Sequence, residues 1–248
     1  DNSVHLINGS FSQKFYDFTK MYGINSKGYF FNKEPYNIKN IKNDFQLVSI
    51  CLNETSTGIM CNNNTINQIR EKLNSGIIAL DCTSGSPSIA FKAKNVDTFY
   101  FSVQKCFGLP SGLGVWVYNE KCISANEKKK ELGGITGSYH SLEKLYKMSL
   151  KSQTPETPNI LGIYLLMKVS EDIIRNGMDS LIKDTNYKST LIYDTIEKHD
   201  LLESSIKNKE IQSKTVIVAN TKISPQIFID KLKAKNLIIG KGYGKNDN

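Results

Sequence analysis

Mostly apolar runs, in which Ser49 and Ser102 are the polar members, recur in the first half of the chain, at 47–52, 77–80 and 99–103. Runs of this length, rich in β-branched and aromatic residues, predict strands that a sheet buries on both faces, which is typical of parallel strands. Segment 65–73, between the first two runs, is expected to form a helix. The resulting order of strand, helix, strand and strand predicts an α/β domain with a mostly parallel sheet.

The same patterns predict elements on both sides of this unit. A short strand at 4–7 is followed by a helix that Ser10 caps and Gly23 ends, with Phe15 and Phe18 on its apolar stripe. The expected later elements, in chain order, are mostly helical 124–151, a long helix opened by Thr157 or Pro158, a helix at 179–201, a strand at 215–219, a helix at 225–234 and a strand at 237–239.

Composition narrows the class of protein. The 248 residues carry a formal net charge of +8, which suits anionic ligands such as phosphates and dicarboxylates. The lysines are dispersed, and the one tight run, 128–130, reads as a solvated helix face, so nucleic acid is not expected as a partner. No apolar run has the length of a membrane span, and the first residues lack a signal pattern. We therefore expect a cytoplasmic protein that does not bind membranes.

Cysteine and histidine usage argues against metal or disulfide chemistry. The five cysteines are scattered without a CxxC pair, and only three histidines accompany them. A zinc site and a disulfide framework are therefore not expected. Histidine side chains can serve in acid–base catalysis, which makes His140 a candidate, but we interpret it as a surface or structural histidine.

Lys105 is the first candidate for chemistry, because the apolar run that ends at Val103 is followed by Gln104 and Lys105. A charged, unpaired amine at the end of a buried strand is costly. Two interpretations remain open on these residues alone. Lys105 either extends its charged end to solvent, or it is a partly desolvated amine with a lowered pKa, the state that forms Schiff bases.

Polar residues also follow the two preceding strands. The string Glu54 to Gly58 (ETSTG) comes after the first strand, and Asp81 ends the second. Both features can have purely structural roles: the string as a capping loop before the next helix, and Asp81 as a helix N-cap or a buried hydrogen-bonding carboxylate. However, the carboxyl ends of parallel strands meet at one edge of the sheet, where open α/β sheets bind ligands.

The segment SVQKCFGLPSGLG at 102–114, together with ETSTG and Asp81 in this order, resembles the class V aminotransferases, which depend on pyridoxal 5'-phosphate (PLP). The resemblance implies that Lys105 carries the cofactor as a Schiff base and that Thr55 bonds its phenolic oxygen. It also implies that Asp81 keeps the pyridine nitrogen protonated and that Gln104 helps to hold the phosphate. Cysteine desulfurases of the same superfamily have a histidine before the lysine, so Gln104 argues against that branch.

The resemblance extends to the fold and to a second subunit. It implies a type I PLP-dependent transferase fold, with an α/β/α large domain over 1–160 and a small α+β domain over 161–248. In the phosphoserine branch, an Asn-Thr-Pro string reaches the cofactor phosphate across the dimer interface. Here Gln153-Thr154-Pro155 takes that place, so a homodimer with a shared site is expected, with Gln in place of the usual Asn.

The function implied is transfer of an amino group between an amino acid and a 2-oxo acid, with Lys105 as the catalytic residue. Phosphoserine and 2-oxoglutarate are the leading substrates. An alanine- or serine–glyoxylate enzyme is an alternative, and so is a non-catalytic protein of the same fold. The family's N-terminal phosphate loop and its C-terminal carboxylate-binding arginine have no counterpart in these 248 residues. We therefore interpret the chain as part of a longer protein.

Overall fold

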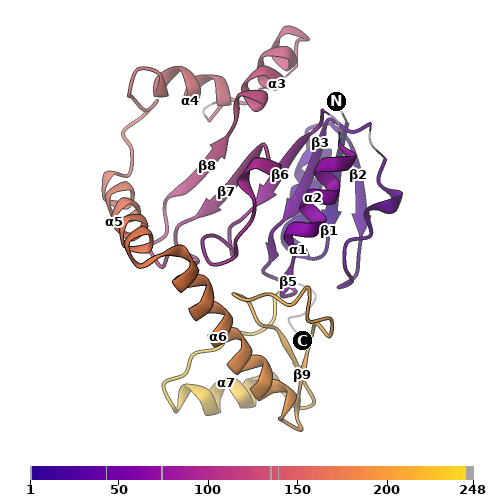
Figure 1. Ribbon diagram of the computed structural model, residues 1–248, viewed down its shortest axis with the longest axis vertical. Coiled ribbons are helices and arrows are strands. Elements are labelled where there is room, and N and C mark those ends of the chain that lie inside the picture. The colour runs from indigo at the N-terminus through magenta and orange to yellow at the C-terminus, as the bar shows by residue number, and fades with distance from the viewer. Residues whose placement is uncertain (1, 43, 74, 135, 139, 244–248) are drawn as a thin grey trace.

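The computed structural model describes residues 2–42, 44–73, 75–134, 136–138 and 140–243, and a single sheet of six strands organises its first half (Figure 1). The strand order is β2-β1-β3-β6-β7-β8. Every neighbouring pair is parallel except β7 and β8, which form an antiparallel hairpin. The strands are β1 (Asn2–Ile7), β2 (Asn25–Phe30), β3 (Leu47–Cys51), β6 (Ile77–Asp81), β7 (Thr98–Ser102) and β8 (Gly114–Tyr118).

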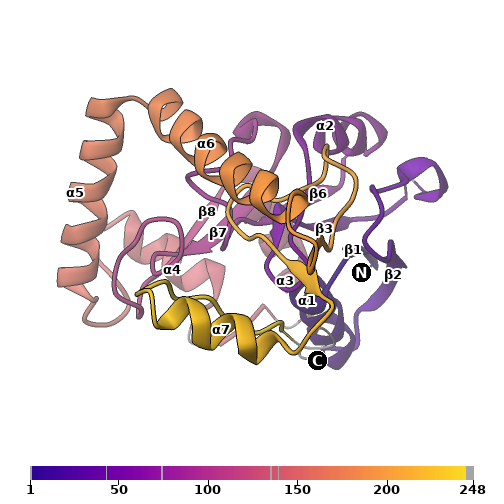
Figure 2. The ribbon, with the colours of Figure 1, turned by 90° about the horizontal axis from the view of Figure 1, so that it is seen from below.

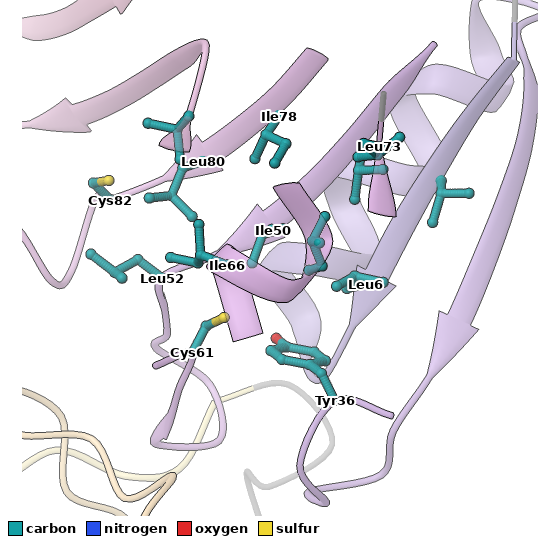
Figure 3. Packing of buried hydrophobic residues seen from close by; sticks show 14 of the residues in the cluster. Leu6, Tyr36, Ile50, Leu52, Cys61, Ile66, Leu73, Ile78, Leu80 and Cys82 are labelled. Carbon is teal, nitrogen blue, oxygen red and sulfur yellow. The ribbon is translucent and has the colours of Figure 1, made fainter. Parts of the chain in front are cut away.

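Helices cover both faces of this sheet. Alternate residues of a strand point to opposite faces, and β1 shows both environments. Leu6 joins the main core with Ile66 of α2 (Asn63–Lys72), whereas the ring of His5 packs against Phe15 of α1 (Ser10–Met21). Figure 3 shows Ile66 close to Ile50, and Ile78 and Leu80 of the central strands belong to the same cluster. The runs predicted as buried strands are therefore the centre of an α/β/α core, which confirms the predicted fold class.

The second half of the chain is mostly helical. It contains α3 (Glu120–Glu131), α4 (Leu142–Ser149), α5 (Ile160–Asn176), α6 (Met178–Glu197), β9 (Leu202–Ser204), β10 (Ala219–Thr221) and α7 (Pro225–Lys233). Strands β9 and β10 pair antiparallel. None of the helices in the described ranges is long and apolar enough to cross a membrane.

A small hairpin joins the two halves. Strands β4 (Asn53–Glu54) and β5 (Ile59–Met60) follow β3 directly. The N–H of Met60 donates to the carbonyl of Ile211 at 2.8 Å, and the N–H of Ser213 donates to the carbonyl of Gly58 at 2.9 Å. Ile59 forms a separate apolar cluster with Ile206 and Ile211. The C-terminal part therefore docks on the loop that follows the central strand β3.

Helix α5 is apolar in sequence but buries none of its residues in this chain. Ile160, Leu161 and Tyr164 are exposed, and both ribbon views place α5 at the margin of the molecule (Figures 1 and 2). An exposed apolar helix face of this kind is uncommon on a protein that acts alone.

One strand was not predicted, and two predicted strands differ in the structure. Strand β2 was not predicted, because an edge strand exposed on alternate residues needs no apolar run. Of the predicted strand at 215–219, only Ala219 lies in a strand, where it begins the pairing with β9. Segment 237–239 is not a strand. In addition, α1 begins at Ser10 itself, after Gly9 as N-cap.

Candidate active site

The hairpin β4–β5 is anchored by Glu54, a carboxylate with no exposed surface. Its oxygens accept hydrogen bonds from the backbone N–H groups of Phe11 and Ser12 in the first turn of α1, at 3.2 and 2.9 Å. They also accept from the hydroxyls of Ser12 and Ser56, both at 2.7 Å, and from the N–H of Ser56. A buried charge needs this kind of compensation, and a helix N-terminus favours an anion.

Gly9 makes this close approach possible. A Cβ built on Gly9 would lie 2.4 Å from the Ser56 hydroxyl oxygen and 2.5 Å from Cγ of Glu54. Because any side chain would collide there, the glycine is required by packing against the hairpin. The helix N-terminus and the ETSTG string are thereby held together.

Thr55, the next residue, lies on the other side of the hairpin and is half-buried. Its hydroxyl donates to the hydroxyl oxygen of Ser84 at 2.8 Å. Ser84 is buried in the loop that follows β6 and also bonds Asn53. The loops after β3 and β6 are therefore joined directly at the carboxyl edge of the sheet.

Asp81 ends β6 and is half-buried. One carboxylate oxygen accepts the N–H of Thr83 at 2.9 Å. Strand register places Cys51 of β3 and Tyr100 of β7 on either side of Asp81. Burial, and then the charge of Asp81, raises the pKa of Cys51 and the pKa of Tyr100 well above their ordinary values. Both neighbours therefore stay neutral and present hydrogen-bond donors to the carboxylate.

Lys105 lies in the turn after β7, three residues beyond its last residue, Ser102. Both Gln104 and Lys105 are exposed in this chain, so the predicted partial burial of the lysine amine is not found. The next residue, Cys106, fixes the turn, because its thiol donates to the carbonyl of Ser84 at 3.2 Å. Gly108 supplies a positive φ of 66° in the same turn, as expected for a tight connection between two strands.

Gln153 and Thr154 lie elsewhere, in the exposed loop between α4 and α5. The N–H of Gln153 donates to the carbonyl of Met148 at 3.0 Å, and the hydroxyl of Thr154 donates to the carbonyl of Glu156 at 2.6 Å. These contacts are local, and none joins the loop to the residues around Lys105. His140, the acid–base candidate set aside in the sequence, is exposed near the start of α4.

Two residues at this edge, Glu54 and Ser84, were not predicted as part of the site. Glu54 stood in the ETSTG string, and Ser84 stood three residues after Asp81, but neither has a sequence signal of its own. Their contacts reach 42 to 43 residues back to α1 and 29 to 31 residues back to the hairpin. Only the fold shows these pairings.

Residues 29–244 match the sequence profile of the family described as Aminotransferase class-V. The chain belongs to that family. The profile match confirms the family that the sequence resembled.

Within the family, the chain is similar to phosphoserine aminotransferases. It is 26% identical to those of Rhodococcus opacus and Rhodococcus jostii, over 99% of this chain and 66% of each relative. It therefore spans about two thirds of the length of these relatives. The crystal structure of a phosphoserine aminotransferase from Cytophaga hutchinsonii superposes with a TM-score of 0.93 at 33% identity, covering all of this chain and 70% of that one. An alanine–glyoxylate aminotransferase from Nostoc sp., 17% identical with a TM-score of 0.85, shares the fold.

The residues at this edge fit PLP, the cofactor of the family. An amine, a carboxylate and a hydroxyl stand at the ends of three neighbouring strands, which matches the aldehyde, ring nitrogen and phenolic oxygen of the cofactor. In addition, the side-chain oxygen of Asn53 is buried without a hydrogen-bond partner among the described residues. A buried polar atom of this kind is rare. It lies in the cluster that holds Thr55, where the described side chains do not complete the polar contacts.

Proposed function

We propose that this chain forms the cofactor-binding part of a PLP-dependent aminotransferase that transfers an amino group between an amino acid and a 2-oxo acid. The observation that carries the proposal is the placement of Thr55, Asp81 and Lys105 at one sheet edge, where Ser84 bonds the hydroxyl of Thr55 and the thiol of Cys106, the residue after Lys105. We propose phosphoserine and 2-oxoglutarate as the substrates, which the similarity to phosphoserine aminotransferases supports.

Each of these side chains has a role that its surroundings allow. When bound, PLP supplies an electron sink for the bonds of the substrate's α-carbon. Lys105 Nζ would bind the cofactor and then take and return the proton of that carbon, from a turn that the bond of the Cys106 thiol to the carbonyl of Ser84 fixes. Asp81, whose carboxylate accepts the N–H of Thr83, would also accept a hydrogen bond from the protonated ring nitrogen. Thr55 would orient the phenolic oxygen.

A second copy of the chain would complete the site. We propose that Gln153 and Thr154 contact the cofactor phosphate of the partner subunit and that Gln104 contacts it within its own subunit. The exposed positions of Gln153 and Thr154 and the uncovered apolar face of α5 next to their loop support a homodimer. We also propose a large domain over 1–160, a small domain over 161–248 and a cytoplasmic location.

The first test is reduction with borohydride in the presence of PLP, followed by peptide mass mapping. We expect a phosphopyridoxyl adduct on Lys105, and loss of that adduct in Lys105→Ala. Lys128→Ala, which removes another exposed lysine, is the matched control and keeps the adduct. Labelling that is absent, or that is spread over many lysines, contradicts the proposed cofactor site in this chain.

The second test concerns the substrates and uses the full-length protein. We expect amino transfer from phosphoserine to 2-oxoglutarate to exceed transfer from alanine or serine to glyoxylate. The reverse preference would favour the glyoxylate branch. Labelling of Lys105 with no transfer for any pair would favour a non-catalytic protein of this fold.

A further inference from the structure

Ser84 makes an unusually complete set of contacts for a serine in a loop. It is 3% exposed. Its hydroxyl oxygen accepts from the Thr55 hydroxyl at 2.8 Å and from the side-chain amide of Asn53 at 2.9 Å, and it donates to the carbonyl of Asn53 at 3.0 Å. A hydroxyl has one proton and two lone pairs, so this group is fully used.

The backbone of Ser84 is fixed as firmly as its side chain. Its carbonyl accepts from the hydroxyl of Thr215 at 2.6 Å and from the thiol of Cys106 at 3.2 Å. Thr215 belongs to the C-terminal part of the chain, and Cys106 follows Lys105. Ser84 is thus the point where the hairpin, the lysine turn and the C-terminal part meet.

This arrangement constrains the proton of Thr55. In the structure that proton points to Ser84, so it is not directed at any other acceptor. Thr55 can donate to an anionic oxygen only if its O–H turns away from Ser84. The 2.8 Å contact then remains favourable only if the Ser84 O–H turns from the carbonyl of Asn53 to the oxygen of Thr55. Two buried oxygens at this distance would otherwise face each other without a proton between them.

We propose that Ser84 is a positioning residue that acts through Thr55, and that the two hydroxyls form a chain which delivers a hydrogen bond to the phenolic oxygen of PLP. This inference rests on the proposed function. No covalent bond forms or breaks: the Thr55 O–H turns to the phenolic oxygen and the Ser84 O–H turns to Thr55. Ser84 still accepts from the amide of Asn53, so its oxygen stays bonded in both arrangements.

A second donor behind Thr55 has a measurable electrostatic effect. A hydroxyl that accepts a hydrogen bond becomes a stronger donor, because bonded chains polarise each other. When the Lys105-bound cofactor has lost its proton, no proton shares the negative charge of the phenolic oxygen. A hydrogen-bond donor to that oxygen therefore stabilises this state most. Ser84 therefore lowers the pH at which the absorption of the bound cofactor changes.

The test compares Ser84→Ala with Ser86→Ala by titrating the cofactor's absorption with pH and by measuring PLP affinity. Ser86 lies in the same loop, and its side chain makes no hydrogen bond within the described residues, so it is the matched control. For Ser84→Ala we expect the pH midpoint of the cofactor's absorption change to rise by about 0.5–1 pH unit. We expect PLP binding to weaken about three- to tenfold, the range for one lost hydrogen bond. Ser86→Ala should leave both values unchanged.

A double-mutant cycle separates this role from a purely structural one. Thr55→Val removes the hydroxyl through which Ser84 acts. In that background, Ser84→Ala should no longer shift the pH midpoint of the cofactor's absorption change. If Ser84→Ala does not fold, Ser84→Cys, which keeps the size and offers a weaker donor, should shift the midpoint in the same direction by less.

The outcomes distinguish the two proposals. An unchanged midpoint in Ser84→Ala, an equal shift in Ser86→Ala, or additive shifts in the cycle would overturn the role of Ser84 while Lys105 labelling still supports the cofactor site. Absence of a Lys105 adduct in the unaltered chain would overturn the proposed function and the hydroxyl chain with it.

Discussion

Lowering the pH from neutrality should weaken the fold through one buried group, His5 of the central strand β1. Its side chain has no exposed surface. Its ring nitrogens bond only hydroxyls among the described residues: Ser3 at 3.0 Å and Thr19 at 3.2 Å on Nε2, and Ser49 at 2.5 Å on Nδ1. Hydroxyls do not compensate a positive charge as a carboxylate would. Burial accordingly lowers the pKa of His5 from 6.5 to about 4.

The sign and size of the effect follow from this pKa. Between pH 6.5 and about 4, the unfolded chain binds a proton at His5 and the folded chain does not. Stability is therefore unaffected by His5 above pH 6.5 and falls as the pH drops towards the folded pKa. At 1.36 kcal/mol per unit of pKa difference, the total loss from this group is about 3 kcal/mol. That is a large share of the free energy of unfolding of a typical domain, which is ~5–15 kcal/mol.

Denaturant unfolding at a series of pH values measures this loss. The free energy of unfolding should fall with a slope approaching about 1.4 kcal/mol per pH unit from His5 within this window. His5→Gln should be less stable at neutral pH, because it loses ring packing against Phe15, but its stability should depend less on pH. His199→Gln is the control, since His199 is exposed and its loss should not change the slope. Equal slopes for His5→Gln and the unaltered chain would refute the argument.

Two further substitutions test the packing around the site and the core. Gly9→Ala places a methyl group against Glu54 and Ser56, and thermal or denaturant unfolding should show a loss of about 1–3 kcal/mol, the usual cost of overpacking; unchanged stability would contradict the close approach. Asp97→Asn should cost about 1–3 kcal/mol by leaving Arg70 without its carboxylate partner, as denaturant unfolding at neutral pH would show. Burial alone would raise the pKa of Asp97, but hydrogen bonds and Arg70 lower it overall. The difference between the unaltered chain and Asp97→Asn should therefore shrink below about pH 4, and a constant difference would contradict this account.

The sheet could be predicted because its central strands are buried on both faces. Segments 47–52 and 77–80 are apolar apart from Ser49, whose hydroxyl bonds His5, so their sequence reveals their environment directly. Strand β2 pairs at the edge with alternate residues exposed, and its polar sequence NSKGYF reveals little. Segment 215–218 (TVIV) has strong strand propensity, but it packs against the hairpin at Gly58 instead of entering a ladder. Strand propensity alone did not make this segment a strand, because no neighbouring strand pairs with it there.

The order of Thr55, Asp81 and Lys105 could likewise be predicted, because each stands shortly after the end of an apolar run and the three together resemble a family pattern. What holds them could not be predicted. The bond from Thr55 to Ser84 spans 29 residues, and the bond from Cys106 to the carbonyl of Ser84 spans 22. Such pairings depend on how the loops after neighbouring strands meet. Neither the period of a segment nor its composition contains that information.

The ETSTG string places a structural and a chemical role on successive residues. Glu54 ends strand β4, and Thr55 opens the turn that follows it. Glu54 faces α1, and its carboxylate accepts five hydrogen bonds there and from Ser56. Thr55 faces Ser84 and the carboxyl edge of the sheet. A shift of register by one residue would exchange these positions and leave the carboxylate at the sheet edge beside Asp81. The collision that any side chain at Gly9 would cause opposes such a shift, because the hairpin and the first turn of α1 fit in one register only. The placement of Thr55 thus depends on a carboxylate and a glycine that take no part in the proposed chemistry.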